Sequence, residues 1–413
     1  MIRNLQSSVW VVGLKVLSGL STFSLYIAFS HYLSPETLGV YELAITIIML
    51  FSTLFSLGYV PFASGEFTRK DLAEVGLSTN KINMAYVVSA SLISLILVPA
   101  VFIFASGMKF NASQWSVILA ASLLFFYKAM YSGVLQHTFR PLKYAFLETC
   151  YPTMIFCISI VYLFLFDGQK IEMLLASHLV ALVFIASLYR QEKQPKIKLV
   201  EQLNVSEFID IFRVSYPWFI VALMSWVMYS SDKWVLEYFF SSAVVGLYAQ
   251  IFKLSSAYNL IVVSTIAIVF SPYIYKSFRS ASKQTTWNMI NKQAAYLCLF
   301  TSVLLLVDLA VGELIYKFVI GEKYHDAFQY NYLIVINFML MAIIGYYGYV
   351  FVYHNRTKYI QMTLFFGAVL NLLISFVITP RLGIYGVVFS SLVSQLCMLC
   401  YTITRAKKML FNT

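Results

Sequence analysis

Three lysine residues, Lys15, Lys128 and Lys253, interrupt long apolar stretches of the sequence. A charged side chain at the centre of a membrane-spanning helix costs about 2.5–3.5 kcal/mol on insertion scales, so such residues face a cavity or a partner. Polar residues follow at helical spacing, for example Ser132 after Lys128 and Ser256 after Lys253. We therefore expect the three lysines to line a wet, cationic cavity that binds an anion such as phosphate or pyrophosphate.

Acidic residues in or near the apolar stretches are candidate partners for these lysines, namely Glu42, Glu148, Asp232 and Asp308. Pairing with them is the alternative to anion binding, and one of the carboxylates could also carry a coupling proton or bind Na+. Asp232 directly precedes Lys233 near the end of a predicted span, which favours an interfacial charge pair there. His178 could titrate near neutral pH, but a hydrogen-bonded packing role is favoured.

Motifs for enzymatic chemistry are absent from the sequence. There is no glycine-rich loop with a Lys-Ser/Thr pair, no HExxH pair and no nucleophile elbow. The five cysteines lie in apolar stretches, and the pair Cys397 and Cys400 has no second pair with which to bind a metal. We therefore expect a protein that is not an enzyme, with no metal site and no cofactor other than a coupling ion, H+ or Na+.

The composition indicates which elements position the charged residues. The chain has 413 residues, of which 60% are hydrophobic and 11% charged, whereas soluble domains carry about 25% charged residues. The run from Leu92 to Ala105 is longer than the segments of about ten residues that form membrane barrel strands. The sequence therefore predicts an all-helical integral membrane protein. This hydropathy also argues against binding to nucleic acid, despite a net charge of +11.

Apolar segments of about 20 residues, the length that spans a bilayer, recur about twelve times. The predicted spans lie near residues 9–31, 38–60, 83–105, 115–137, 147–166, 171–189, 214–236, 243–270, 293–316, 328–352, 358–378 and 383–403. Twenty of the 29 Lys and Arg residues fall on one side of these spans and five on the other. Because cytoplasmic loops carry the excess of positive charge, both termini are expected in the cytoplasm.

The two halves of the sequence resemble each other. Three short segments recur in the same order. Residues 33–41 resemble residues 240–248, residues 107–110 resemble residues 321–324, and residues 140–144 resemble residues 356–359. Six helices per half is an even number, so the repeats run parallel and form two six-helix bundles with a cavity between them, which is typical of transporters. The predicted domains are residues 1–190, a cytoplasmic linker at 191–213, and residues 214–413. Gly39 and Gly246, at equivalent positions, can allow close helix contact, but ordinary helix starts are the favoured explanation of these residues.

Several of these segments are similar to segments of Wzx-type polysaccharide flippases, a branch of the multidrug/oligosaccharidyl-lipid/polysaccharide flippase superfamily. The similar segments are residues 33–41, 231–237 running on to 245–248, 321–324 with Ala327, and 383–386. The resemblance covers essentially the whole chain and implies two six-helix bundles with alternating access. Related lipid II flippases have a cationic central cavity with contributions from helices 1, 2 and 8, and Lys15 and Lys253 suit helices 1 and 8.

The resemblance also implies a function, a location and partners. The implied substrate is an undecaprenyl-pyrophosphate-linked oligosaccharide such as an O-antigen unit, moved from the cytoplasmic to the periplasmic leaflet of the bacterial cytoplasmic membrane. Membrane lipids surround such a protein, and its expected protein partners are a polysaccharide polymerase and a chain-length regulator.

Three other functions remain as alternatives. A multidrug or cation antiporter of the same superfamily would need acidic residues in its cavity, whereas the first span here carries Lys15 and no acid. A polysaccharide polymerase or ligase typically carries a large outer loop, and the outer loops here are short. The third alternative is a membrane protein with a purely structural role.

Overall fold

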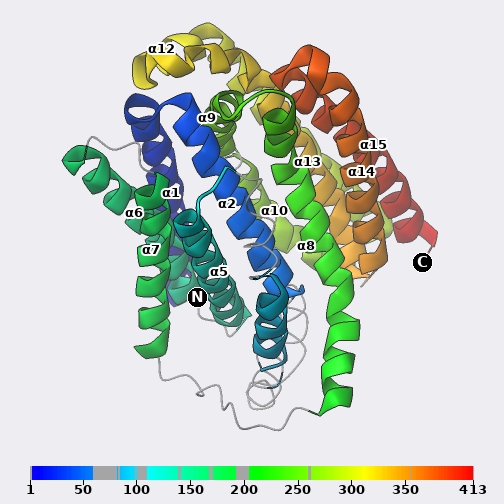
Figure 1. The fold of residues 1–413 in the computed structure, drawn as a ribbon. Helices are drawn as coiled ribbons and strands as arrows, with labels where there is room; N and C mark the ends of the chain where they lie inside the picture. Colours follow the sequence, from blue (N-terminus) through cyan, green and yellow to red (C-terminus); the bar gives the residue numbers. More distant parts are fainter. Residues whose placement is uncertain are drawn as a thin grey trace. The chain divides into compact units, whose positions relative to one another are not determined.

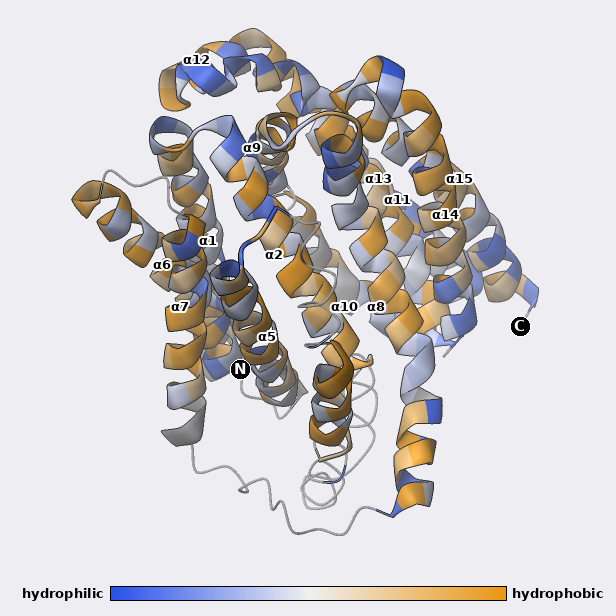
Figure 2. Cartoon of the chain, viewed as in Figure 1, coloured by the Kyte–Doolittle hydropathy of each residue, from blue (hydrophilic) through white to orange (hydrophobic). Residues whose placement is uncertain are grey.

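The computed structural model describes residues 2–58, 81, 84–97, 99, 109–137, 141–166, 171–191, 204–258, 262–354 and 356–412. Every regular element in these ranges is a helix (Figure 1), which confirms the all-helical membrane fold expected from the sequence. Helices suit an apolar surrounding because they satisfy the backbone N–H and C=O groups without water. Hydrophobic residues predominate along the helices, as Figure 2 shows.

The chain order of the helices follows the two predicted halves. The first half contains α1 (Ile2–Tyr32), α2 (Pro35–Ser56), a shorter apolar helix at Met84–Leu97, α5 (Ala112–His137), α6 (Pro141–Leu165) and α7 (Ile171–Gln191). The second half contains α8 (Val205–Phe239), α9 (Ser242–Tyr258), α10 (Ser264–Ser280), α11 (Lys283–Val307), the π-helix η3 (Asp308–Gly312), α12 (Glu313–Val319), the 3-10 helix η4 (Glu322–Tyr330), α13 (Asn331–Tyr353), α14 (Thr357–Leu382) and α15 (Ile384–Asn412).

Within the described residues, eight helical segments are long and apolar enough to cross a membrane, or nine if the bent α8 counts as one span. The bend in α8 is 47° and lies between Arg213 and Ser215. Pro217 lies one turn further on. Because its ring nitrogen cannot donate a hydrogen bond to the carbonyl of Arg213, this proline accounts for the bend.

Three predicted spans differ in detail from the helices observed. The span near 243–270 consists of α9 and α10, and residues 259–261 between them lie outside the described residues. The span near 293–316 begins earlier, at Lys283, because the Ser282 hydroxyl caps the helix by accepting a hydrogen bond from the Thr285 backbone N–H (3.1 Å). It is then interrupted by η3. The span near 83–105 is described only for residues 84–97 and 99.

Internal contacts divide the chain into two compact units. Unit 1 comprises residues 1–25 and 40–226, and unit 2 comprises residues 26–39 and 227–413. The sequence-based boundaries place all residues up to 190 in the first domain, whereas the contacts assign residues 26–39, the turn between α1 and α2, to unit 2. The predicted linker at 191–213 lies partly outside the described residues, and its described end is the start of α8.

Each unit has its own interior. In unit 1, α7 packs against α5 and α6, and an apolar cluster of Leu135, Leu147 and Ile185 is surrounded by tyrosine side chains. In unit 2, α15 packs against both α13 and α14.

Candidate functional site

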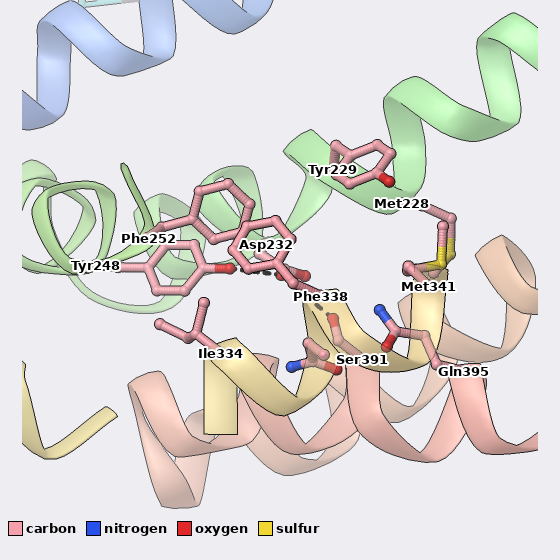
Figure 3. A pocket seen from close by; sticks show the side chains of 11 residues that line it. Met228, Tyr229, Asp232, Tyr248, Phe252, Ile334, Phe338, Met341, Ser391 and Gln395 are labelled. Atoms are coloured by element: carbon pink, nitrogen blue, oxygen red, sulfur yellow. Dashed lines mark hydrogen bonds between the residues drawn. The ribbon is translucent and has the colours of Figure 1, made fainter. Parts of the chain in front are cut away.

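The most deeply buried acidic site in unit 2 is centred on Asp232 of α8. Its side chain is only 4% exposed. The Tyr248 hydroxyl of α9 donates a hydrogen bond to Asp232 Oδ2 (2.8 Å), and the Ser391 hydroxyl of α15 lies 3.3 Å from the same oxygen. Figure 3 shows both contacts. The Asn371 side chain and the charge of Lys233 also act on this carboxylate, and together these groups offset part of the cost of burying its charge.

A small cavity of about 30 Å³ adjoins this carboxylate. Four helices line it, namely α8, α9, α13 and α15. The lining residues are Met228, Tyr229, Asp232, Tyr248, Phe252, Ile334, Asn337, Phe338, Met341, Ser391 and Gln395 (Figure 3). Since one water occupies roughly 10–15 Å³ on this measure, the cavity has room for one or two waters or for a small cation.

Three side-chain oxygens of the cavity residues receive no hydrogen bond from the described residues. They are Asp232 Oδ1, Asn337 Oδ1 and Gln395 Oε1, and all three are buried. The Asn337 amide nitrogen is engaged elsewhere, because it donates to the Val388 carbonyl (3.3 Å). Buried acceptors are rarely left without a partner. A carboxylate and two amide oxygens beside one small cavity match the ligands that hard cations prefer, and a proton on Asp232 would also remove the buried charge.

The sequence-based interpretation of Asp232 and Lys233 as an interfacial pair at a helix end is wrong. α8 continues to Phe239, and both side chains are 4% exposed. Asn337, Gln395 and Ser391 were missed because they are uncharged and do not stand out in an apolar helix. The spacing of Ser391 and Gln395, four residues apart on one face of α15, is the signal that points to them.

Lys128 of unit 1 forms an ion pair with Glu148. Its Nζ donates to both carboxylate oxygens of Glu148, at 2.8 and 2.9 Å, and the Ser132 hydroxyl donates to Oε1 (2.6 Å). The rings of Phe125 and Tyr151 lie 5.4 and 5.1 Å from the ammonium group. The structure therefore shows for Lys128 the paired arrangement that the sequence left open as an alternative, and substrate binding by Lys128 stays a prediction.

The other two lysines lie in different surroundings. Lys15 of α1 belongs to unit 1 and is exposed. Lys253 of α9 belongs to unit 2, is half-buried and lies 5.3 Å from the centre of the Tyr26 ring. Aromatic faces attract cations, so this ring helps to orient the ammonium group. Binding of an anion by Lys15 and Lys253 likewise stays a prediction.

Two further acidic residues occupy contrasting positions. Glu42 of α2 is fully buried in unit 1, deeper than a carboxylate near a span end would be. Asp308 opens the π-helix η3 in unit 2 and accepts a hydrogen bond from the Asn331 amide nitrogen (2.7 Å). Asn331 in turn accepts from the Ser255 hydroxyl (2.5 Å), so Asp308 is tied to α9 through α13. A coupling role for either acid is untested.

The fold is similar to that of known membrane transporters. A structure described as the lipid II flippase MurJ matches with a TM-score of 0.73 at 13% identity, covering 98% of this chain and 87% of that one. A multidrug resistance MATE family transporter of the MOP superfamily matches with a TM-score of 0.71 at 14% identity, over 96% and 95% of the two chains. The Vibrio cholerae MATE transporter VcmN matches with a TM-score of 0.57 at 14% identity, over 99% and 96%. The protein therefore shares the fold of these transporters.

A comparison of the sequence with protein-family models identifies a family. A family model described as polysaccharide biosynthesis protein matches residues 5–278. The chain belongs to this polysaccharide biosynthesis protein family. No match was found among curated proteins.

Proposed function

We propose that the protein is a flippase for a lipid-linked oligosaccharide, of the undecaprenyl-pyrophosphate-linked kind from which polysaccharides such as O-antigen are built. The observation that carries the proposal is the combination of a polysaccharide biosynthesis family match with the MOP transporter fold. In this proposal the protein lies in the bacterial cytoplasmic membrane with both termini in the cytoplasm. It moves the substrate from the cytoplasmic to the periplasmic leaflet.

In this proposal the lysines bind the negatively charged pyrophosphate of the substrate. A pyrophosphate needs cationic partners when it leaves water. Lys15 is exposed, and Lys253 is half-buried beside the Tyr26 ring. Lys128 contributes only if its pair with Glu148 opens. The sugar passes through a wet cavity by alternating access, while the lipid tail stays in the bilayer.

In this proposal the movement of a coupling cation that binds at Asp232 drives transport. Na+ would be held by the buried oxygens of Asp232, Asn337 and Gln395 that receive no hydrogen bond from the described residues. H+ would instead neutralise the carboxylate of Asp232 alone. Moving one such charge across a potential of 100 mV is worth about 2.3 kcal/mol, which biases transport about fortyfold. A polymerase and a chain-length regulator would act on the product after it reaches the periplasmic leaflet.

A multidrug or cation antiporter is the second candidate function. The buried carboxylate of Asp232 and the likeness to MATE transporters favour it. It differs in its substrate, which would be a cationic organic molecule. That molecule would bind in the cavity in which we propose that the anionic pyrophosphate binds. The two candidates therefore require opposite charges in the transport cavity.

The deciding experiment is deletion of the gene in its host, followed by extraction of lipid-linked oligosaccharides. We expect complete units to accumulate on the cytoplasmic side and surface polysaccharide to be lost. Wild-type protein should restore the polysaccharide, Lys253→Ala should restore it poorly, and the exposed residue change Lys407→Ala should act like wild type. Unchanged surface polysaccharide, together with increased sensitivity to cationic drugs, would establish the antiporter instead.

A further inference from the structure

His178 of α7 lies between two tyrosine hydroxyl groups in the interior of unit 1. The Tyr41 hydroxyl of α2 is 2.6 Å from His178 Nε2, and the Tyr151 hydroxyl of α6 is 2.7 Å from Nδ1. Both imidazole nitrogens are therefore engaged, by residues from two other helices. The three side chains are held firmly, since His178 is 7% exposed and Tyr41 is 2% exposed.

This arrangement accommodates both protonation states of the imidazole. A neutral histidine has one N–H donor and one acceptor nitrogen, whereas a charged histidine has two donors. A phenol group can donate or accept, so one tyrosine donates to the neutral ring and both accept from the charged ring. A backbone carbonyl in place of either tyrosine would fix one tautomer, because a carbonyl only accepts.

Charged groups surround this triad on the helices that pack against α7. From α5, Lys128 Nζ lies 5.1 Å from the Tyr151 ring centre. From α6, Glu148 lies three residues before Tyr151 and interacts electrostatically with its phenol group. From α2, Glu42 directly follows Tyr41 and is fully buried.

We propose that Tyr41, His178 and Tyr151 form a proton-binding site in unit 1, with the proton carried on the imidazole of His178. The ligand is a proton from water, and both imidazole N–H groups donate to phenol oxygens after it binds. Unit 1 then has a cation-binding group of its own, separate from Asp232 in unit 2. The meaning of this site for transport rests on the proposed function, whereas proton binding itself does not.

The test is a pH titration of the full-length protein in lipid nanodiscs, followed by NMR of 15N-labelled histidine rings. The chain has only five histidines, and the variant His178→Asn assigns the His178 signals. We expect both His178 ring nitrogens to change from the neutral to the charged form between about pH 5 and 8. A ring that keeps one neutral tautomer over this whole range would overturn the proposal.

Conservative tyrosine variants test the geometry. Tyr151→Phe and Tyr41→Phe keep the rings but remove one acceptor each, so we expect His178 to bind its proton about tenfold more weakly, a downward shift of about one pH unit. Tyr162→Phe is the matched control, because Tyr162 is also buried on α6 and its hydroxyl has no partner among the described residues. Equal titrations for Tyr151→Phe and the control would contradict the assignment.

These measurements need no transport substrate. A protein that binds a proton at His178 but moves cationic drugs would give the same titration, so failure of the flippase proposal is seen only in the deletion experiment. If a tyrosine variant does not fold, the wild-type titration still decides whether His178 binds a proton.

Discussion

Gly39 of α2 and Gly246 of α9 lie so close together that a Cβ atom on either one would overlap backbone atoms of the other helix. A Cβ on Gly39 would meet the carbonyl of Ser242, and a Cβ on Gly246 would meet that of Pro35. The two glycines occupy equivalent positions of the sequence repeat, and each approaches the first turn of the partner's helix. The structure therefore shows close helix contact at these positions, whereas the sequence favoured ordinary helix starts as the full explanation of the two glycines.

Substituting these glycines should destabilise the protein. We expect Gly39→Ala and Gly246→Ala each to cost about 1–3 kcal/mol, because packed backbone atoms cannot move aside for an extra methyl group. Thermal unfolding in detergent, followed by size-exclusion chromatography, measures the loss.

Gly345→Ala and Gly348→Ala on α13 are the matched controls. A Cβ at either position meets nothing within 4 Å. Alanine there should be neutral or should stabilise the helix by up to about 1 kcal/mol. Unfolding temperatures that fall equally in all four variants would refute the close contact as the cause.

Removing Lys128 should leave the carboxylate of Glu148 without its cation. Its side chain is 32% exposed, against 8% for Lys128, so the pair is intermediate between a surface pair and a buried one. We expect Lys128→Met to cost more than the roughly 1 kcal/mol of an exposed pair and less than the about 3–5 kcal/mol of a fully buried one.

The double variant Lys128→Met/Glu148→Gln should recover most of that stability, since it buries no uncompensated charge. Thermal unfolding and a transport assay on both proteins separate stability from function. If the double variant regains stability but not transport, Lys128 also binds the substrate. A single variant as stable as wild type would show that the ion pair contributes nothing to the fold.

A cation at Asp232 should stabilise the protein measurably. A bound ligand at about 100 times its dissociation constant adds roughly 2.7 kcal/mol to the free energy of unfolding. We expect NaCl, compared with choline chloride at equal ionic strength, to raise the unfolding temperature of the wild type by a few degrees. Asp232→Asn, which keeps the size and the hydrogen bonds, should abolish the rise, and the exposed Asp326→Asn should not.

The proton alternative gives a different result in the same experiment. Na+ would then have no specific effect, but the pH dependence of unfolding would differ between the wild type and Asp232→Asn. If neither Na+ nor pH distinguishes Asp232→Asn from the wild type, no coupling cation binds there.

Acid should weaken the native state through His354, which directly follows α13. Burial lowers the pKa of His354 below its ordinary value, and the nearby Arg356 and Lys283 lower it further. The unfolded chain therefore binds this proton more readily than the native protein. The stability contributed by the neutral ring is complete above the unfolded pKa of about 6.5 and is lost as pH falls through the folded pKa.

We expect His354→Gln to lose less thermal stability than the wild type between about pH 7 and 5. The control is the same comparison above about pH 7.5, where His354 is neutral in both states and the difference between the two proteins should not change with pH. A steeper loss of thermal stability in His354→Gln than in the wild type would contradict this prediction.

The helices could be predicted from the sequence because lipid-facing residues must be apolar over a fixed length. Runs such as that around Leu92–Leu97 therefore indicate membrane helices without knowledge of their neighbours. Charged residues in these runs, such as Lys128, were also found, since their cost makes them conspicuous. Glu148 was named only as one of four candidate partners, because the pairing of Lys128 with Glu148 depends on how α5 and α6 pack.

Neutral polar residues at a buried site are harder to recognise from the sequence than charged ones. Asn337 and Gln395 lower the mean hydropathy of a helix only slightly, and their importance appears when three helices bring their oxygens to one cavity. Asp232 was noticed, but its burial was misjudged, because the end of α8 was expected before Phe239. Sequence patterns locate helix ends within a few residues, and a few residues separate a solvated carboxylate from a buried one.

The division into units has a practical consequence for anyone who wishes to cut the protein in two. α1, α2 and α8 each contribute residues to both units, since the unit boundaries fall at Leu25, Gly39 and Trp226. Breaking the chain in the predicted linker at 191–213 would leave residues 26–39 on the fragment that lacks the rest of unit 2. Neither fragment would carry a complete set of its own contacts, so the two halves of the sequence are not interchangeable modules.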